Sequence, residues 1–281
     1  MKVCIVGIGL IGGSLAIDLK RRGFASAIIG VDANIHHQNI ALHSGLVDEI
    51  DILENAVNKS DLIILSTPVN ANREMLPGIL SLIEGTAKVV TDMGSTKAGI
   101  SGAVLNHQNR GRFVASHPMA GTEFSGPMAA IGKLFDYKHV IICDRELSDA
   151  DALETVADMY KILNMRLSFM TAVDHDIHVA YVSHISHITS FALALSVLDK
   201  EKDEENILKL AGGGFDSTVR LAKSNAETWA PIFLQNSEYI IEVIDNYLEK
   251  INLFKKHILE KNPEGLKDLM NEANKIRKIL N

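Results

Sequence analysis

The chain has 281 residues, of which 47% are apolar and 22% charged, and its formal net charge is −7. This composition is typical of a globular protein with a large core and excludes a disordered chain. Because the chain is acidic and shows no Lys/Arg cluster, the sequence argues against nucleic acid or an anionic membrane as a partner.

The first part of the chain alternates short apolar runs with helix-compatible segments. Strand-like runs cover 2–7, 27–32, 61–67, 87–92, 112–115, 139–144 and 165–170, and helical patterns cover 12–23, 35–44, 70–84 and 149–164. Apolar strands without alternation, separated by helices, predict a parallel sheet covered on both faces. The sequence therefore predicts an α/β domain of the Rossmann type, with a doubly wound parallel sheet.

After Thr171 no convincing strand pattern follows. Residues 172–200 contain neither Pro nor Gly and predict a long, mostly buried helix. Further along we expect a charged, solvated helix end or loop at 200–206, a break at 211–217, a long helix over 231–261 and a shorter polar helix over 263–281. This half is therefore predicted to be all-helical.

The change of character near residue 171 predicts two domains. Residues 1–171 would bind the nucleotide, and 172–281 would bind substrate and form a dimer. Long apolar helices in a second domain often pack against another copy of the same chain, which favours a homodimer. The alternative is that these helices pack only on the Rossmann domain of their own chain.

The N-terminus and the cysteines bear on the compartment. Four glycines break the apolar run at the N-terminus, and no cleavage site follows, which argues against a signal peptide. No later window shows the roughly 18 uncharged apolar residues of a membrane span. Cys4 and Cys143 lie in apolar strand-like runs and predict buried, reduced thiols. We therefore expect a soluble, cytoplasmic protein without membrane contact.

The segment Gly7-Ile8-Gly9-Leu10-Ile11-Gly12 is a G-x-G-x-x-G motif between a predicted strand and a predicted helix. The first glycine allows a tight turn, the second lets the backbone approach a pyrophosphate, and the third lets helix and strand pack closely. The helix N-terminus adds amides and a positive dipole end. This context predicts a dinucleotide site formed by residues 7–12.

Asp32 ends the second predicted strand, 20 residues after Gly12. A carboxylate at this place accepts hydrogen bonds from adenosine ribose hydroxyls and repels a 2′-phosphate. No arginine follows it, since the next residues are Ala33, Asn34 and Ile35. The sequence therefore favours NAD over NADP.

Two further strand ends carry polar turns, Ser66-Thr67-Pro68 and Asp92-Met93-Gly94-Ser95-Thr96-Lys97. The carboxyl ends of parallel strands form the ligand crevice, so we expect Ser66, Thr67, Pro68 and Asp92 to contact the cofactor. Ser95 could cap the next helix, face the nicotinamide, or do both. Lys97 could equally be a solvated surface residue.

The segment SHPMAGTEFSG, residues 116–126, contains the best candidate for a catalytic base. An enzyme that oxidises an alcohol with NAD needs a group to take the hydroxyl proton, and histidine titrates near neutrality. His117 follows a predicted strand, so we expect it at the rim of the crevice. The alternative interpretation is that His117 lies in an ordinary polar surface loop.

The helical half adds two histidines and an arginine. His184 and His187 lie within about 60° of each other on one helix face, and could bind a metal, fill the core or bind substrate. Because serine and aliphatic residues surround them, we expect no metal. Arg220 follows a triple glycine and could bind a substrate carboxylate as a bidentate fork or form a structural salt bridge.

Taken in order, these motifs resemble the prephenate/arogenate dehydrogenase family over almost the whole chain. The matching segments are GIGLIGGS (7–14), STPV (66–69), DMGSTK (92–97), SHPMAGTEFSG, SHISH (183–187) and GGGFDSTVRLAKSNAETW (212–229). The resemblance implies NAD-dependent oxidative decarboxylation of the dicarboxylate prephenate to 4-hydroxyphenylpyruvate, in tyrosine biosynthesis. Arogenate, which would give tyrosine directly, is the alternative substrate.

The resemblance also implies roles for individual residues. His117 would bind the ring hydroxyl of the substrate, and Ser95 would help to orient it. His187 and Arg220 would hold the substrate, with Arg220 on a carboxylate. His184, Thr122, Glu123 and Trp229 would shape the pocket. The rival interpretations are another NAD-linked hydroxyacid dehydrogenase and an NAD(H)-binding regulatory protein without turnover.

Overall fold

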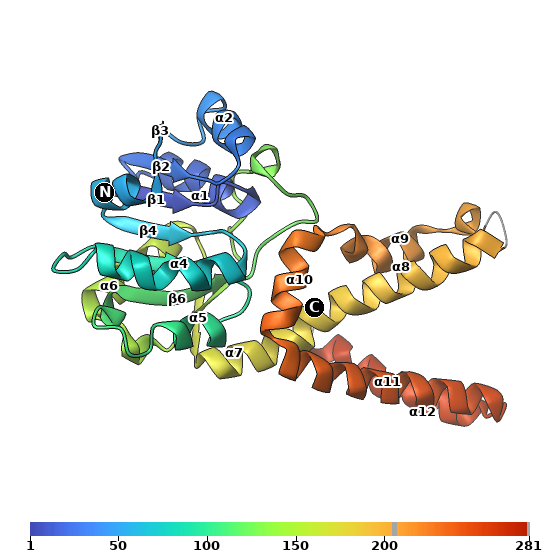
Figure 1. Cartoon of the computed structure of the whole chain (residues 1–281). Helices are drawn as coiled ribbons and strands as arrows, with labels where there is room; N and C mark the ends of the chain where they lie inside the picture. The colour runs from blue at the N-terminus through green and yellow to red at the C-terminus, as the bar shows by residue number, and fades with distance from the viewer. Residues whose placement is uncertain (204–206, 280–281) are drawn as a thin grey trace. The chain divides into compact units, whose positions relative to one another are not determined.

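The structure is a computed structural model that describes residues 1–203 and 207–279 (Figure 1). It divides into two compact units, Met1–Asn236 and Ser237–Asn281. Part of the predicted charged stretch at 200–206, and the end of the predicted helix over 263–281, lie outside the described residues.

An eight-stranded sheet forms the centre of the first unit, in the order β3-β2-β1-β4-β5-β6-β7-β8. The strands are β1 (Lys2–Val6), β2 (Ala27–Val31), β3 (Glu49–Ile50), β4 (Leu62–Leu65), β5 (Val89–Asp92), β6 (Phe113–Pro118), β7 (His139–Cys143) and β8 (Arg166–Met170). The order reverses direction beside β1, as in a doubly wound fold, which confirms the predicted fold class. The two-residue strand β3 is too short to show in a sequence pattern.

One pair of strands departs from the predicted parallel sheet, because β6 and β7 are antiparallel. Parallel neighbours need a crossover connection, usually a helix. Between β6 and β7 the described chain forms only the short 3-10 helix η2 (Pro127–Ala129), so the strand returns beside its predecessor in the opposite direction. The other neighbouring pairs of this sheet are parallel.

Helices cover both faces of the sheet (Figure 1). One face packs against α1 (Leu10–Arg21), α2 (Ile35–His43) and α6 (Ala150–Ile162), and the other against α3 (Leu53–Lys59), α4 (Val69–Leu82), α5 (Ala98–Ala103) and the start of α7 (Ala172–Val179). Strand residues alternate between the two cores: Ile28 belongs to the first and Ile29 to the second. Cys4 and Cys143 are buried, free thiols in the second core, as predicted.

The predicted long helix over 172–200 exists, but a π-helical turn interrupts it. The chain runs through α7, the π-turn η4 (Ala180–His184) and α8 (Ile185–Asp203). The expectation that it is mostly buried is wrong for this chain, since Val182 is 70% and Leu195 61% exposed. Exposed apolar side chains on a long helix are typical of a surface that packs against another chain.

The same stretch bears on the expectation that no membrane span is present. Ala172–Lys202 is, among the described residues, a helical stretch long and apolar enough to cross a membrane by length and composition alone. Because serines and histidines interrupt this stretch, it is not an uninterrupted run of apolar residues, although its mean hydropathy is high. Core helices of other proteins pass the same test, so the finding by itself is only weak evidence for a membrane span.

The described residues of the first unit after α8 form short helices and turns, and their breaks differ from those predicted. A helix, α9 (Gly213–Val219), begins inside the segment predicted to be a break, and the long helix predicted over 231–261 is divided into α10 (Ala226–Gln235) and α11 (Ser237–Leu259). Short 3-10 helices lie at η1 (Arg110–Arg112), η3 (Arg145–Leu147), η5 (Leu208–Leu210) and η6 (Arg220–Lys223).

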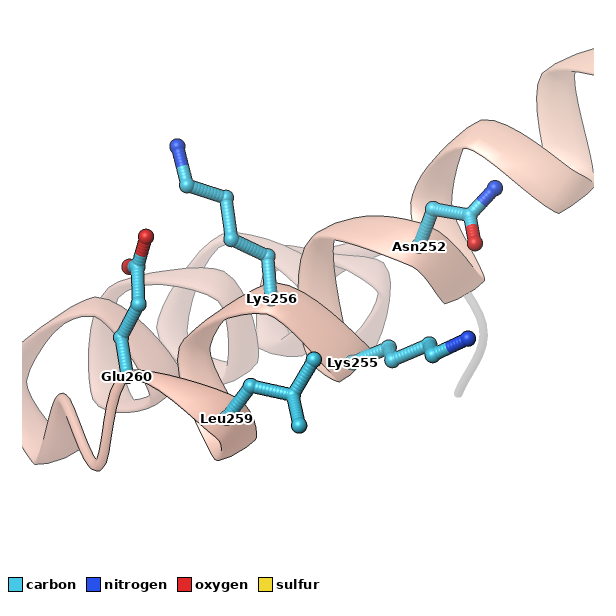
Figure 2. Close-up of a pocket in the computed structure, with 5 residues that line it drawn as sticks. All are labelled: Asn252, Lys255, Lys256, Leu259 and Glu260. Atoms are coloured by element: carbon cyan, nitrogen blue, oxygen red, sulfur yellow. The ribbon is translucent and has the colours of Figure 1, made fainter.

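The second unit consists of α11, α12 (Pro263–Ala273) and the 3-10 helix η7 (Asn274–Lys278). Its exposed large apolar side chains include Ile241, Tyr247, Leu248, Ile251, Ile258, Leu259 and Met270. A hollow of about 410 Å³ lies on α11 and is lined by Asn252, Lys255, Lys256, Leu259 and Glu260. In Figure 2 these side chains spread apart rather than converging on one point, and none is a predicted site residue.

Candidate active site

The glycine-rich turn after β1 has the geometry that its motif predicts. Gly7 has a φ of +92°, which disfavours any side chain. A Cβ at Gly12 would stand 2.0 Å from the Gly7 carbonyl oxygen, so this position also needs glycine. A Cβ at Gly9 would meet nothing within 4 Å. The backbone is therefore open at Gly9, just before Leu10 and Ile11 begin α1.

Asp32 lies against this turn, one residue after β2. Its carboxylate accepts hydrogen bonds from the Ile8 amide at 2.9 Å and the Asn34 amide at 2.8 Å. Its basic neighbour is His37, whose Nδ1 lies 3.5 Å from Asp32 Oδ2. The sequence interpretation missed His37, which is the third residue of α2, an otherwise ordinary surface helix.

The Ser66-Thr67-Pro68 turn holds the glycine loop in place. Ser66 Oγ donates a hydrogen bond to the Gly7 carbonyl oxygen at 2.6 Å, and a Cβ on Gly7 would stand 2.7 Å from Ser66 O. The Thr67 hydroxyl donates to the Asn72 side chain, and Pro68 directly precedes α4. The hydroxyls of Ser66 and Thr67 thus bond within the protein.

The turn after β5 contains a buried ion pair. Lys97 Nζ bonds to Asp92 Oδ2, and both side chains are at most 1% exposed. Asp92 also accepts from the Gly94 amide at 3.0 Å and the Ser116 amide at 3.2 Å. The alternative that Lys97 is a solvated surface residue is therefore wrong.

His117 lies inside β6, not in the following loop, and pairs with Ile141 of β7. The alternative of a place in a polar surface loop is therefore wrong. Its side chain is buried, and its Nδ1 lies 2.8 Å from His175 Nε2. His175 Nδ1 lies 2.7 Å from Asp176 Oδ1. The sequence interpretation missed His175 and Asp176, because a histidine beside an aspartate in a helix has no motif of its own.

Asp176 connects this histidine pair to the start of α5. Its two carboxylate oxygens accept from the backbone amides of Lys97 at 2.7 Å and Ala98 at 2.8 Å. Lys97 occupies the N-cap position of α5, so Ser95 does not cap that helix. Ser95 is half-buried and lies two residues before this cap.

The electrostatic surroundings keep the histidines of this cluster neutral. Burial, together with the nearby His175, Lys97 and His184, holds the pKa of His117 well below its usual value. Burial lowers the pKa of His175 as well, against the opposing effect of Asp176. Burial also lowers the pKa of His184 to about 4. A neutral His117 has a lone pair and can accept a proton.

The π-helical turn ends at His184, and the rings of His184 and His187 both contact Trp229. His184 is buried, and its Nδ1 lies 3.1 Å from Asn236 Nδ2. The ring of His187 stacks on Trp229, with 3.4 Å between centroids and 24° between planes. Burial lowers the pKa of His187, and the nearby Arg220 lowers it further. A π-helical turn often occurs at a functional site.

Arg220 and Glu123 form an ion pair that joins η6 to the loop after β6. Arg220 Nη1 lies 3.4 Å from Glu123 Oε2, and the arginine side chain is 52% exposed. Thr122, just before Glu123, accepts a hydrogen bond from the Phe124 amide at 3.3 Å. A hollow of about 610 Å³ adjoins this loop, lined by Glu123, Phe124, Ser125, Met128, Ala129 and Ile131.

The predicted site residues thus fall into two connected groups. The cofactor candidates meet around the glycine turn and at the ends of β2, β4 and β5. The substrate candidates gather around His117 and around Trp229, and Lys97, His175 and Asn236 join them without having been predicted as site residues. Among residues 1–203 and 207–279, no group of three or more His, Cys, Asp or Glu could hold a metal ion.

Two family models together cover most of the chain. Residues 15–169 match the model described as prephenate dehydrogenase, nucleotide-binding domain. Residues 171–272 match the model described as prephenate dehydrogenase, dimerization domain.

Individual proteins are similar over nearly the full length. A prephenate dehydrogenase from Lactococcus lactis subsp. cremoris is 28% identical, over 99% of this chain and 77% of its own. A solved prephenate dehydrogenase from A. aeolicus, in complex with hydroxyphenyl propionate and NAD+, is 30% identical with a TM-score of 0.88, over 100% of this chain and 98% of its own. A solved arogenate dehydrogenase from Synechocystis is 28% identical with a TM-score of 0.75, over 99% of both chains.

Proposed function

Because the chain belongs to the prephenate dehydrogenase family, we propose that it catalyses the NAD-dependent oxidative decarboxylation of prephenate to 4-hydroxyphenylpyruvate. The observation that carries the proposal is the buried His117 at the end of β6, held neutral beside the polar ends of the sheet strands. A neutral histidine at this edge is suited to take a hydroxyl proton.

The residues around the glycine turn fit a dinucleotide. The open backbone at Gly9, the glycine required at Gly12 and the N-terminus of α1 form a cradle for a pyrophosphate. Asp32 would accept hydrogen bonds from the ribose hydroxyls, and its negative charge disfavours the 2′-phosphate of NADP. We therefore propose NAD, with Ser66, Thr67, Pro68 and Asp92 shaping its surroundings. When bound, NAD supplies the acceptor for the hydride from the carbinol carbon.

His117 is proposed to move the hydroxyl proton. Its Nε2 takes the proton of the ring hydroxyl as hydride leaves the same carbon. The bond between the ring and its carboxylate then breaks, and its electron pair completes the aromatic ring while CO2 leaves. The former hydroxyl oxygen now needs a proton, which His117 returns. The protein ends in the protonation state in which it started, and aromatisation makes the step effectively irreversible.

Arg220 and His187 are proposed to hold the substrate. Arginine binds a carboxylate in a bidentate fork, and Arg220 already lies beside the carboxylate of Glu123. A substrate carboxylate would replace Glu123, so this ion pair would open as substrate enters. His187, stacked on Trp229, would present its ring edge beside Arg220.

The remaining predicted residues are proposed to complete the pocket. Ser95 would orient the ring hydroxyl, since its side chain is not required to cap α5. His184 is proposed to shape the pocket through its neighbours, because its ring is buried beside Asn236. Thr122 fixes the turn that carries Glu123.

We further propose a soluble, cytoplasmic homodimer with domains at 1–171 and 172–281. The exposed apolar side chains of α8 and of α11 support the dimer, as does the match of 171–272 to a model described as a dimerization domain. The change of family model between residues 169 and 171 supports the domain boundary.

A kinetic comparison tests the substrate. The purified protein is given NAD with prephenate, and separately with arogenate, while NADH and CO2 are measured together. We expect both products in equal amounts from prephenate, at a kcat/KM at least tenfold above that for arogenate. A preference for arogenate would assign the second substrate, and NADH without CO2 would indicate a different hydroxyacid dehydrogenase.

A further inference from the structure

His117 is the last member of a chain of three side chains, and the other two are absent from the proposed mechanism. His117 Nδ1 lies 2.8 Å from His175 Nε2, and His175 Nδ1 lies 2.7 Å from Asp176 Oδ1. All three side chains are buried. We propose, on the basis of the proposed function, that His175 and Asp176 are positioning residues that fix which nitrogen of His117 carries the proton.

The direction of each hydrogen bond follows from what each atom can donate. An ionised carboxylate only accepts, and Asp176 already accepts from the amides of Lys97 and Ala98. His175 must therefore carry its proton on Nδ1 to bond to Asp176. Neutral His175 then has a bare Nε2, which accepts a hydrogen bond from His117 Nδ1. Neutral His117 is left with an unprotonated Nε2, the atom that a base needs.

Asp176 is held in place by the backbone, so the chain starts from a fixed end. Its carboxylate bonds to two amides at the start of α5, and its own carbonyl accepts a hydrogen bond from Asn236 at 2.8 Å. A rotation of Asp176 would leave the amides of Lys97 and Ala98 without a partner, which is costly at a buried site. The carboxylate therefore defines the tautomer of both histidines.

The charges around the pair support this assignment. His117 faces His175, Lys97 and His184, and burial together with these groups keeps it neutral at rest. His175 faces Asp176, Lys97 and Asp92. When His117 takes the substrate proton, its Nδ1–H still points to His175, and the negative charge of Asp176 lies beyond. The chain thus stabilises the transient cation, as the orienting carboxylate of a catalytic triad does.

The sharpest variant is Asp176→Asn, which keeps size but adds a donor. Asp176 Oδ1 accepts from both His175 Nδ1 and the Lys97 amide, and Oδ2 accepts from the Ala98 amide. In the rotamer that keeps the asparagine oxygen on the Ala98 amide, the new NH2 group replaces Oδ1 and donates to His175 Nδ1, so His175 carries its proton on Nε2 and donates to His117. His117 Nε2 is then protonated and cannot act as the base. We expect kcat to fall on the order of 10²-fold or more, while KM for prephenate and Kd for NAD change less than threefold. Asp174→Asn, an exposed neighbour on α7, is the matched control and should keep kcat within twofold.

Two substitutions at His175 distinguish a role in orienting His117 from a role in the stability of the fold. His175→Gln offers an oxygen to His117 and an amide to Asp176, and should retain activity within roughly tenfold of the wild type. His175→Phe offers neither and should lose as much as Asp176→Asn, with the acid limb of its kcat/KM profile at lower pH because the His117 cation loses its acceptor. If Gln is as inactive as Phe, or if Asp176→Asn retains full kcat while its His117 carries the proton on Nε2, the proposal is wrong.

A measurement without turnover separates this proposal from the proposed function. Histidine ¹⁵N NMR of the free enzyme reports which ring nitrogen is protonated. We expect a proton on Nδ1 of His117 in the wild type and on Nε2 in Asp176→Asn. A wild-type protein that oxidises neither substrate but shows this exchange would overturn the function and retain the relay. A proton on Nε2 of wild-type His117 would overturn the relay alone.

Discussion

The glycine turn and the His117 cluster are both polar sites at the ends of the sheet strands, but they are assembled over different distances in the sequence. The shape of the turn depends on Gly7, Gly12 and Asp32, all within the first 32 residues, and Ser66 adds one hydrogen bond from the end of β4. The cluster joins Lys97, His117 and His175 with Asn236, from elements spread over 140 residues. Local backbone constraints define the first site, and tertiary packing defines the second.

The largest expected effect is at the base of the cluster. His117→Asn should lower kcat roughly 10²–10⁴-fold, because the amide cannot take the hydroxyl proton. NAD binding should remain, since the glycine turn is unchanged, and isothermal titration measures it. His139→Asn, an exposed histidine on the neighbouring strand β7, is the control. An unchanged turnover in His117→Asn would remove the general-base role.

The next effect concerns stability. Lys97→Met leaves the Asp92 carboxylate buried without its partner, and should lower the free energy of unfolding by about 3–5 kcal/mol. Urea denaturation measures it. The double variant Lys97→Met/Asp92→Asn should recover most of this loss, because neither residue is then charged. A single variant as stable as the wild type would show that Asp92 finds another partner.

A smaller effect is expected where the site meets solvent. Arg220→Ala should raise KM for prephenate on the order of 10²-fold, the worth of a charge-assisted bond to a carboxylate, and leave KM for NAD nearly unchanged. Lys223→Ala, an exposed cation on the same 3-10 helix, is the control. Equal effects of Arg220→Ala on both values of KM would place Arg220 outside the substrate site.

The smallest effect is a dependence of stability on pH. Burial lowers the pKa of His184 to about 4 from 6.5, so the unfolded chain binds more protons than the folded one as pH falls below 6.5. Stability is therefore complete above pH 6.5 and is lost on acidification. We expect a loss of about 2 kcal/mol from this group by pH 5, measured by urea denaturation at both pH values.

His117 and His175 have lowered pKa values and add to the same trend. His184→Phe should reduce the loss between pH 7 and pH 5 but not remove it. If the variant loses as much stability as the wild type over this interval, His184 is not neutral because of burial.

The sequence alone determined the features that depend on neighbouring residues. The periods of the apolar runs located the principal strands and the first helices, and the G-x-G-x-x-G motif located the turn whose geometry Gly7 and Gly12 require. His117 was also identified from the sequence as the candidate base, because it follows a predicted strand whose end faces the crevice, although its place inside β6 was not predicted.

Tertiary structure decided what depends on distant partners. The direction of β7 depends on a connection without a crossover helix, and the burial of Lys97 depends on Asp92, although a lysine in a polar turn looks like a surface residue. The proposed role of His175 and Asp176 depends on their hydrogen bonds to His117 and to the start of α5, which only the fold brings together. A sequence records which groups are present, but hydrogen-bond direction and burial arise only when separate elements pack together.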